Sequence, residues 1–397
     1  MERLAARACP ICCETRVEVL RTFRFVLPEG HPLSDGYDVV CCQCCGLVFA
    51  DTTVTQQDYV AFYASFSIYE DGKTGAGSGD VPWDAQRLEQ TAAELARFLP
   101  NKQTRLLDIG CANGGLLDVF KQRGYTNLYG FDPSPTCVAN TRNRRGIEAF
   151  VGSLSSVPDH LGRFDCVILS HVMEHVYDLQ QAVQCIGKLT QPNGVIYIEV
   201  PDASRYAEFV VAPFQDFNTE HINHFSLRCL TNLFRPAGWL SRVQGQKIVY
   251  AAPDKPYPAV YALYTRSPHG STFVIERDHD LCEGIKHYII RSQKIMDTIE
   301  AKLRQVIETN SEVIVWGTGQ LTMKLLAETS LGQARIAAFV DSNPINQGKC
   351  LRGRPILAPA QIKELYCPII VASLLHSAEI ADVIRNQMEL PNPIILL

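Results

Sequence analysis

One short stretch of the chain constrains its fold more than any other: residues 105–115 read R-L-L-D-I-G-C-A-N-G-G. An apolar run at 104–109 predicts a strand, the glycines predict a tight turn, and residues 115–123 predict a helix. A second apolar run at 127–131 then ends on Asp132. In α/β sheets a turn of this kind lets the backbone approach a nucleotide-like ligand, and an acid roughly 20 residues farther on accepts hydrogen bonds from ribose hydroxyls. The pattern therefore predicts an α/β fold with such a ligand at the turn.

The spacing inside the turn is D-x-G-x-A-x-G rather than G-x-G-x-x-G, and Asp108 lies on the strand just before the first glycine. This variant resembles the S-adenosylmethionine (SAM) site of class I methyltransferases. The resemblance implies that Asp108 lies near the cationic methionine end and that Asp132 holds the ribose. A glycine turn without a ligand is the alternative, which two acids and two glycines in register disfavour. The residues expected to bind SAM are Asp108, Gly110, Cys111, Ala112, Gly114, Asp132, Pro133, Ser153, Leu154, Ser170 and His171.

The composition limits the classes of protein to which the chain can belong. A length of 397 residues predicts two or three domains, and a hydrophobic content of 46% supports ordinary buried cores. The net charge of −5 and the pI of about 6.1 disfavour a nucleic-acid partner. No apolar run approaches the ~20 residues of a membrane span, and residues 1–7 lack the apolar core of a signal peptide. We therefore expect a cytoplasmic enzyme that acts on a small molecule, without a membrane partner.

Three parts are expected along the chain: a zinc-binding module over 1–75, a methyltransferase domain over 76–250, and a helical linker with a Rossmann-like domain over 251–397. Strands and helices alternate in the central part, which favours a doubly wound parallel sheet. The proline-rich stretch 253–268 is interpreted as a junction, and residues 283–308 as a helix. Beyond those already given, the predicted strands are 164–169, 195–200, 312–316 and 334–341, and the predicted helices are 85–98, 135–145 and 179–189.

The cysteines are clustered, because seven of the fifteen fall between Cys9 and Cys45. In a long chain without a secretion signal, such a cluster indicates a metal site rather than disulfides. Four thiolates in two C-x-x-C pairs suit a tetrahedral structural Zn²⁺ that has no open position. We choose Cys9, Cys12, Cys42 and Cys45 as ligands because a glycine follows the second pair. The spacing leaves open that Cys13, Cys41 or Cys44 replaces one of them, and buried or reactive free thiols are the alternative.

Two further segments carry candidate catalytic histidines. The predicted strand 164–169 runs into S-H-V-M-E-H, so Ser170, His171 and His175 lie beyond the carboxyl end of a strand, where open α/β sheets bind ligands. The four-residue spacing of the two histidines allows a metal pair, but we favour a SAM contact or a helix start. Glu220 and His221 are adjacent in a polar and aromatic segment, and a carboxylate can orient and tune an imidazole as a general base. A loop that only covers SAM is the alternative.

Taken together, the C-x-x-C…C-x-x-C-G-L-V-F start, the central SAM motif, the E-H-x-N-H-F-S segment and the C-terminal glycine turn resemble the nucleotide-sugar C-methyltransferases. These enzymes act on dTDP-linked 4-keto-deoxysugars. The resemblance covers essentially the whole chain. It implies a class I SAM methyltransferase with a doubly wound sheet, flanked by a small N-terminal zinc module and a C-terminal Rossmann-like α/β domain.

The resemblance also implies a base-assisted C-methylation in which no metal takes part. His221 removes the proton beside a ketone, and the resulting enolate carbon attacks the methyl group of SAM. Glu220 orients the base, Tyr63 or Tyr69 stabilises the enolate oxygen, and His175 completes the catalytic set. The nucleotide sugar is expected to contact Asn218, Asn223, His224, Gly317, Gly319 and Asp341.

The C-terminal turn by itself imitates a dinucleotide fingerprint, since Asp341 follows Gly317 by 24 residues. It lacks the third glycine, and the remaining chain is about half of a complete dinucleotide fold. We therefore prefer a contact surface for a nucleotide sugar, or a vestigial Rossmann-like unit, to a hydride-transfer site.

Two other functions stay open from the sequence. One is O-methylation of a sugar or other small metabolite, in which His221 deprotonates a hydroxyl. The other is a non-enzymic scaffold that combines the zinc module with an inactive SAM fold. The intact acid–glycine–acid set argues against the scaffold.

Overall fold

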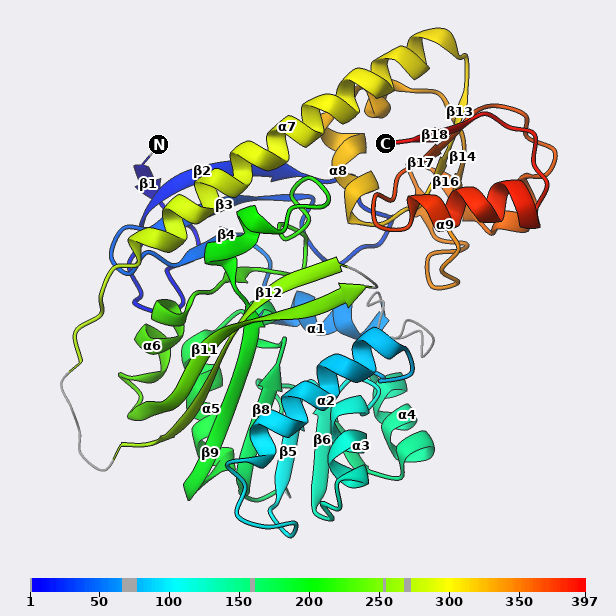
Figure 1. Cartoon of the computed structure of the whole chain (residues 1–397). Coiled ribbons are helices and arrows are strands. Elements are labelled where there is room, and N and C mark those ends of the chain that lie inside the picture. The colour runs from blue at the N-terminus through cyan, green and yellow to red at the C-terminus, as the bar shows by residue number, and fades with distance from the viewer. Residues whose placement is uncertain (1, 66–76, 158–160, 253–254, 268–272) are drawn as a thin grey trace. The chain divides into compact units, whose positions relative to one another are not determined.

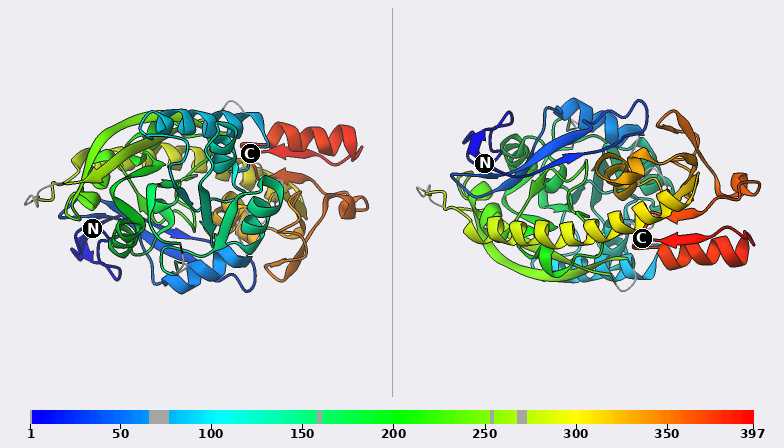
Figure 2. Two further views of the ribbon diagram at one scale, coloured as in Figure 1. Left: turned by 90° about the horizontal axis from the view of Figure 1, so that it is seen from below. Right: turned by 90° about the horizontal axis from the view of Figure 1, so that it is seen from above.

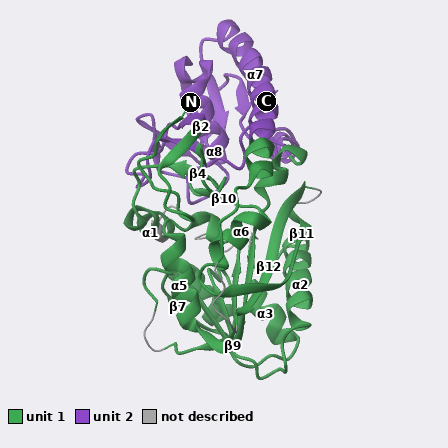
Figure 3. Ribbon diagram, turned by 90° about the vertical axis from the view of Figure 1, so that its left-hand side faces the viewer, with its two compact units in different colours: residues 1–19, 40–209, 220–285 green, residues 20–39, 210–219, 286–397 purple. Residues whose placement is uncertain are grey.

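The computed structural model describes residues 2–65, 77–157, 161–252, 255–267 and 273–397 (Figure 1). The chain divides into two compact units, which are coloured in Figure 3. Unit 1 comprises residues 1–19, 40–209 and 220–285, and unit 2 comprises residues 20–39, 210–219 and 286–397. Each unit is therefore built from three separate stretches of chain, and the division into parts at 75/76 and 250/251 stays a prediction.

Unit 1 contains a seven-stranded sheet in the order β11-β12-β9-β8-β5-β6-β7. The central strand β5 pairs in parallel with β6 and β8, whereas β12 pairs antiparallel with β9 and β11. All four residues of β5 are buried, as a strand covered on both faces requires. The strands are β5 (Leu106–Ile109), β6 (Leu128–Asp132), β7 (Glu148–Val151), β8 (Phe164–Ser170), β9 (Thr190–Pro201), β11 (Trp239–Ala252) and β12 (Lys255–Arg266).

Helices cover both faces of this sheet, with α2, α3 and α4 on one face and α5 and α6 on the other (Figures 1 and 2). Local sequence fixes where several of them begin. The side chain of Ser134 accepts a hydrogen bond from the backbone N–H of Cys137, and Asp178 accepts one from Gln181, so each caps the helix that follows. The helices are α2 (Pro82–Ala96), α3 (Gly115–Gln122), α4 (Pro135–Arg145), α5 (Leu179–Leu189) and α6 (Leu227–Phe234).

The proline-rich stretch is not a junction, which corrects the interpretation from the sequence. Residues 255–266 form β12, which pairs with β9 and β11 inside the sheet. Its two prolines, Pro256 and Pro258, face Tyr250 and Ile248 of β11 near the start of the strand. Proline is tolerated near the start of a strand, where a missing backbone donor costs least. Composition alone therefore hid a strand that completes the sheet.

The N-terminal strands form a second sheet in the order β1-β2-β3-β4-β10. The two residues of β10 (Asn223–His224) pair antiparallel with Phe49 and Val48 of β4 (Val48–Asp51). The segment that carries the predicted base is therefore joined to the strand that follows the cysteine cluster. The other strands are β1 (Glu2–Leu4), β2 (Arg16–Arg24) and β3 (Gly36–Cys42), and α1 (Gln56–Ser65) follows β4.

Unit 2 contains a six-stranded sheet in the order β15-β16-β14-β13-β17-β18. Its strands are parallel except for β15, and their core-facing residues are almost all aliphatic. The long helix α7 (His279–Thr309) precedes it and is continuous (Figure 2). The strands are β13 (Val313–Trp316), β14 (Ile336–Val340), β15 (Cys350–Leu351), β16 (Arg354–Leu357), β17 (Ile369–Val371) and β18 (Ile394–Leu396), with α8 (Gln320–Glu328) after β13 and α9 (Ser377–Asp382) after β17.

Among the residues that the structure describes, none of the helices combines the length and the apolar character that crossing a membrane requires.

Candidate functional site

The strand order of unit 1 points to one end of the sheet. From β5 the chain moves to β6 and β7 on one side, and it then returns to β8 and β9 on the other. Such a reversal leaves a crevice at the carboxyl ends of the two central strands, where open α/β sheets bind ligands. A cavity of about 420 Å³ lies there. Its size falls within the roughly 300–1,000 Å³ of small-molecule sites.

The glycine turn after β5 forms one wall of the cavity. Gly110 and Gly114 have positive φ angles of 72° and 77°, which favour glycine. A Cβ on Gly110 would lie 2.7 Å from Cγ2 of Val172, and one on Gly114 would lie 2.8 Å from the side chain of Thr141. The packing of the turn itself therefore requires both glycines, in addition to any need of a ligand for close approach.

Asp132, at the end of β6, holds this turn in place. Its Oδ2 accepts the backbone N–H of Ala112 at 2.9 Å, and its Oδ1 accepts that of Ser134, also at 2.9 Å. Each carboxylate oxygen has a second acceptor position. Asp132 can therefore bind a hydroxyl of a ligand while it fixes the turn.

Asp108 is almost completely buried on β5 and lines the same cavity. Burial and the neighbouring charge of Asp132 raise the pKa of Asp108 to about 8. A buried carboxyl of this kind ionises more readily when a cation binds beside it. SAM carries a sulfonium and an ammonium group, so the carboxylates of this wall fit the cationic groups of SAM.

The end of β8 forms the opposite wall and carries His171 in a left-handed conformation, with φ of 56°. The Nδ1 atom of His171 lies 3.4 Å from Oε1 of Glu174, and its Nε2 atom lies 3.3 Å from Oε1 of Glu199. Burial alone lowers the pKa of His171, but the interactions with these two carboxylates outweigh it and raise the pKa to about 9. His171 is therefore an imidazolium at neutral pH.

Glu199 of β9 is fully buried behind His171. Its Oε2 lies 2.5 Å from Nζ of Lys247 and accepts the hydroxyl of Tyr197 at 2.7 Å. Burial opposes its ionisation, but Lys247 and His171 hold the pKa of Glu199 well below its usual range. This side of the site is thus a paired set of buried charges.

The segment that carries Glu220 and His221 is bound to the turn after β8. The side-chain amide of Asn223 donates to the carbonyl oxygens of Met173 at 3.1 Å and Val176 at 2.7 Å. The backbone N–H of Ile222 donates to the carbonyl oxygen of Glu174 at 2.9 Å. These bonds hold His221 against the 3₁₀ helix η2 (Met173–His175).

A cluster of titratable side chains results. The rings of His175 and His221 meet edge to face with their centroids 4.8 Å apart, and the ring of Tyr63 lies 5.8 Å from that of His175. The Nδ1 atom of His175 is 3.1 Å from the carbonyl oxygen of Glu220, which can only accept, so this nitrogen carries the proton. Ligating atoms of Glu174, His175 and His221 lie within 4.8 Å of one another, a set that could also hold a metal ion.

Glu220 differs from its neighbour. Burial raises the pKa of its carboxyl to about 7, but the described residues that line the cavity include His221 and Glu174 and not Glu220. His224 is buried in β10, where burial lowers its pKa to about 3. The roles predicted for Glu220, Asn223 and His224 in catalysis or substrate binding stay predictions.

The structure gathers most of the predicted site residues around one cavity. Gly114 caps α3 behind the wall, and Tyr69 lies outside the described residues. The predicted residues that line the cavity are Tyr63, Asp108, Gly110, Cys111, Ala112, Asp132, Pro133, Ser153, Leu154, Ser170, His171, His175 and His221.

Glu174, Glu199 and Lys247 were not among the residues predicted from the sequence. Glu174 lies between the two histidines of S-H-V-M-E-H. The signal available in the sequence was this group of polar residues, interrupted by two apolar ones. Glu199 follows four apolar or aromatic residues on a strand, where a lone acid often faces solvent. Its ion pair with Lys247 joins positions 48 residues apart in the chain and carries no local pattern.

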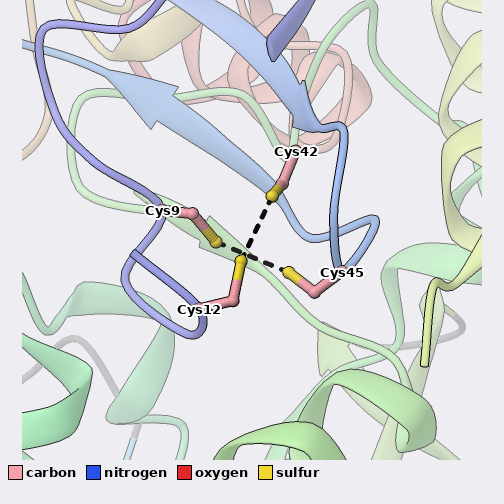
Figure 4. A group of neighbouring side chains, drawn as sticks. All are labelled: Cys9, Cys12, Cys42 and Cys45. Carbon is pink, nitrogen blue, oxygen red and sulfur yellow. Dashed lines mark hydrogen bonds between the residues drawn. The ribbon is translucent and has the colours of Figure 1, made fainter. Parts of the chain in front are cut away.

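The four chosen cysteines converge, with their sulfur atoms directed toward one another (Figure 4). The Sγ atoms of Cys9 and Cys45 are 3.5 Å apart, and those of Cys12 and Cys42 are 3.4 Å apart. Four sulfurs at about 2.3 Å from a tetrahedral Zn²⁺ are separated by roughly 3.8 Å, so a small expansion accommodates the ion. Cys13, Cys41 and Cys44 lie outside this set.

The predicted substrate residues Asn218, Gly317, Gly319 and Asp341 belong to unit 2. The backbone N–H and hydroxyl of Thr318 both donate to Oδ2 of Asp341, at 2.9 and 2.5 Å. Asp341 therefore closes the glycine turn after β13, as Asp132 does in unit 1. The carbonyl oxygen of Asn218 accepts the hydroxyl of Tyr37 at 2.8 Å, and contact of these residues with a substrate stays a prediction.

Comparison with known proteins bears on both units. Residues 83–240 match the family described as a methyltransferase domain, and residues 309–395 match the family described as C2185-like, N-terminal. The C-methyltransferase NovU from Streptomyces niveus is 26% identical over 271 residues, which are 64% of this chain and 63% of NovU. The mitochondrial ubiquinone biosynthesis O-methyltransferase of Bos taurus is 29% identical over 127 residues, 30% of this chain and 34% of that protein.

Solved structures are also similar. An S-adenosylmethionine-dependent methyltransferase from Mesorhizobium loti aligns with 45% of this chain and 100% of its own, at 17% identity and a TM-score of 0.37. The alignments span less than two thirds of either curated relative. The family match and the sheet of unit 1 confirm the predicted class I fold, with residues 83–240 as its methyltransferase domain.

Proposed function

We propose that the protein transfers the methyl group of SAM to the carbon beside a ketone in a nucleotide-linked deoxysugar, with His221 as the general base. One observation carries this proposal: the acid–glycine–acid wall and the histidine cluster face the same cavity. The similarity to a C-methyltransferase over 271 residues supports carbon as the methylated atom. The nucleotide sugar itself rests on the resemblance drawn from the sequence.

Each wall has a distinct task in this proposal. Asp108 and Asp132 hold SAM, and bound SAM supplies an electrophilic methyl group. His221 takes the proton from the carbon beside the ketone, and the electron pair of that C–H bond passes into an enolate. Tyr63 lies next to His175 and can donate a hydrogen bond to the enolate oxygen. A neighbouring carboxylate assists the base, and the sequence predicts Glu220 for this role. Binding both substrates in one cavity supplies much of the rate.

The chemistry is balanced without a further reagent. One C–H bond breaks, one C–C bond forms, and the S–CH₃ bond breaks to leave a neutral thioether. The released proton remains on a ring nitrogen of His221 until the product leaves. The buried ion pairs of His171, Glu199 and Lys247 keep that side of the cavity polar and rigid.

O-methylation is the second candidate, because several curated relatives are ubiquinone biosynthesis O-methyltransferases. In that case His221 deprotonates a hydroxyl rather than a carbon. A non-enzymic scaffold is less favoured, because the described cavity keeps both acids of the SAM motif.

A panel of dTDP-, GDP-, UDP- and CDP-linked 4-keto-deoxysugars, incubated with SAM, distinguishes the candidates. A product that gains about 14 mass units, the mass of one methylene group, retains its ketone and shows a new C–CH₃ signal by NMR supports C-methylation. A methoxy signal supports the alternative. His221→Ala should abolish turnover with little loss of SAM affinity, whereas His279→Ala, an exposed histidine on α7, should leave both unchanged.

We also propose that Cys9, Cys12, Cys42 and Cys45 hold a structural Zn²⁺. The convergence of four thiols and the absence of an open ligand position support a structural rather than a catalytic ion. β10 pairs with β4, which begins three residues after Cys45, so the ion would stabilise the strand next to His221. Metal analysis of the purified protein tests this assignment.

A further inference from the structure

A buried carboxylate faces the cavity beside the proposed base. His221 and Glu174 both line the cavity, and Glu174 is only 1% exposed. The adjacent residue Glu220 uses its backbone carbonyl to accept a hydrogen bond from His175. Of these two acids, Glu174 and not Glu220 is among the described residues that line the cavity.

We infer that Glu174 is the carboxylate partner of His221: it orients the imidazole and stabilises the imidazolium that forms when the base takes the substrate proton. Ligating atoms of Glu174, His175 and His221 lie within 4.8 Å of one another. The backbone of Glu174 also holds this segment, since its carbonyl oxygen accepts the N–H of Ile222 at 2.9 Å. One residue thus fixes both the chain and the charge beside the base.

The neighbouring charges support this role. His171 lies between the carboxylates of Glu174 and Glu199, and Lys247 forms ion pairs with Glu199 and Glu94, so the cationic groups beside Glu174 already have carboxylate partners before reaction. A proton on His221 adds one positive charge to a buried site. A carboxylate within a few ångströms stabilises such a charge far more in a protein interior than in water.

The contacts of His175 point the same way. Its Nδ1–H donates to the carbonyl oxygen of Glu220, and its Nε2 atom lies 3.9 Å from Oε1 of Glu174. The carbonyl oxygen of Glu220 and the carboxylate of Glu174 are both hydrogen-bond acceptors. With its proton on Nδ1, His175 donates to Glu220, so its Nε2 atom can donate to Glu174 only after it gains a proton. When a proton reaches the cluster from His221, Glu174 can therefore share it with His175.

A bound metal ion is the rival occupant of this set. Ligand atoms at about 2.1 Å from a tetrahedral ion lie roughly 3.4 Å apart, and neighbouring ligands around an octahedral ion lie closer. The separation of 3.9 Å between Nε2 of His175 and Oε1 of Glu174 is wider than either distance between neighbouring ligands. Proton transfer thus fits the geometry of Glu174 better than metal binding.

The test uses the full-length protein with Glu174→Gln, which keeps the shape and removes the charge. Imidazole NMR titration should show the pKa of His221 lowered by about one unit or more, because an adjacent negative charge is lost. Glu148→Gln, an exposed carboxylate on β7, is the matched control and should leave it unchanged. An unchanged His221 pKa in Glu174→Gln would overturn the inference, as would a larger effect from Glu220→Gln.

This measurement needs no turnover, so it decides the pairing even if the proposed function fails. The role in catalysis rests on that function and has its own readout. With a keto-sugar that is turned over, kcat should fall about 100-fold or more, while KM for SAM changes by less than about twofold. The acid limb of the pH–rate profile should move to lower pH.

Two further measurements separate this role of Glu174 from a structural role and from metal binding. Glu174→Asp keeps the charge at a shorter reach and should restore part of the activity, which a purely structural role would not predict. If Glu174→Gln fails to fold by circular dichroism, the titration of Glu174→Asp decides in its place. Stoichiometric binding of Mn²⁺ by electron paramagnetic resonance that is lost in Glu174→Gln would assign the cluster to a metal and overturn the inference.

Discussion

The side-chain amide of Asn223 donates to the carbonyl oxygen of Val176 at 2.7 Å, and this bond joins the segment of the proposed base to the turn after β8. The same amide group also donates to Met173, and its oxygen accepts Nη2 of Arg7 at 3.1 Å. The position of His221 therefore depends on a residue that is itself buried and does not need to touch a substrate.

Replacing Asn223 by alanine should destabilise the protein and slow the reaction. The change leaves two buried carbonyl groups and the guanidinium of Arg7 without this partner, which costs about 1–3 kcal/mol of the free energy of unfolding. Urea denaturation measures the loss. Asn143→Ala, at an exposed position of α4, is the comparison, and equal stabilities for the two variants would contradict the assignment.

The affinity for SAM should rise with pH between about 7 and 9. Asp108 has a pKa near 8 in the free protein, so at pH 7 most molecules must lose a proton before the carboxylate can pair with a cationic ligand. Calorimetric titration with SAM in buffers of different ionisation enthalpy measures this proton release. Asp108→Asn should bind more weakly and show a flat pH dependence, and a pH-dependent affinity in that variant would argue against Asp108.

The same carboxyl should affect stability in the opposite sense. Because the pKa of Asp108 is higher in the folded protein than in the unfolded chain, the stability penalty is absent below about pH 4, grows as the pH rises, and is complete above about pH 8. Without ligand, Asp108→Asn should exceed the unmodified protein in free energy of unfolding by more than about 1 kcal/mol at pH 8.5. The difference should vanish near pH 4.

Loss of Lys247 should be more damaging than loss of its whole ion pair. Lys247→Met leaves Glu199 buried beside Tyr197 without its principal cation and should cost about 3–5 kcal/mol. The double variant Lys247→Met with Glu199→Gln removes both charges and should recover part of that loss. Chemical denaturation of the two variants measures the difference, and a double variant that is less stable than the single one would contradict this pairing.

Removal of one proposed zinc ligand should release the metal and unfold the N-terminal strands. Cys12→Ser is expected to lose stoichiometric zinc by elemental analysis and to lower the melting temperature. Cys13→Ser is the matched control, since Cys13 is exposed, adjacent in sequence and outside the converging set. Equal zinc content in both variants would show that the ligand set is different.

The sequence predicted four of the seven strands of the central sheet, β5, β6, β8 and β9, because each contains a short apolar run followed by a turn, whereas β7 and β11 were not predicted. The helix at 179–189 was predicted at its observed bounds, where an aspartate cap and an apolar stripe leave little ambiguity. The strand at 255–266 was missed because two prolines and three tyrosines obscure its alternation. Its place depends on pairing with β9, which is far away in the chain.

The site was predictable where its chemistry is local. Asp108, the glycines and Asp132 form a compact pattern, and the strand–turn–helix–strand order places them together at one wall. The pairing of His221 with Glu174 could not be predicted, because 47 residues separate them and only the fold brings them together. Adjacency favoured Glu220, whose assisting role stays a prediction.

The discontinuous make-up of unit 2 has a practical consequence for anyone who wishes to exchange parts between related proteins. The ring of Phe217 packs against Tyr288 at 5.2 Å, and Nζ of Lys324 donates to the carbonyl oxygen of Phe214 at 2.5 Å. A chain cut at residue 286 would keep these two phenylalanines and lose their contacts with Tyr288 and Lys324. The C-terminal region is therefore not a detachable cassette, and a chimaera that transplants it must carry residues 20–39 and 210–219 as well.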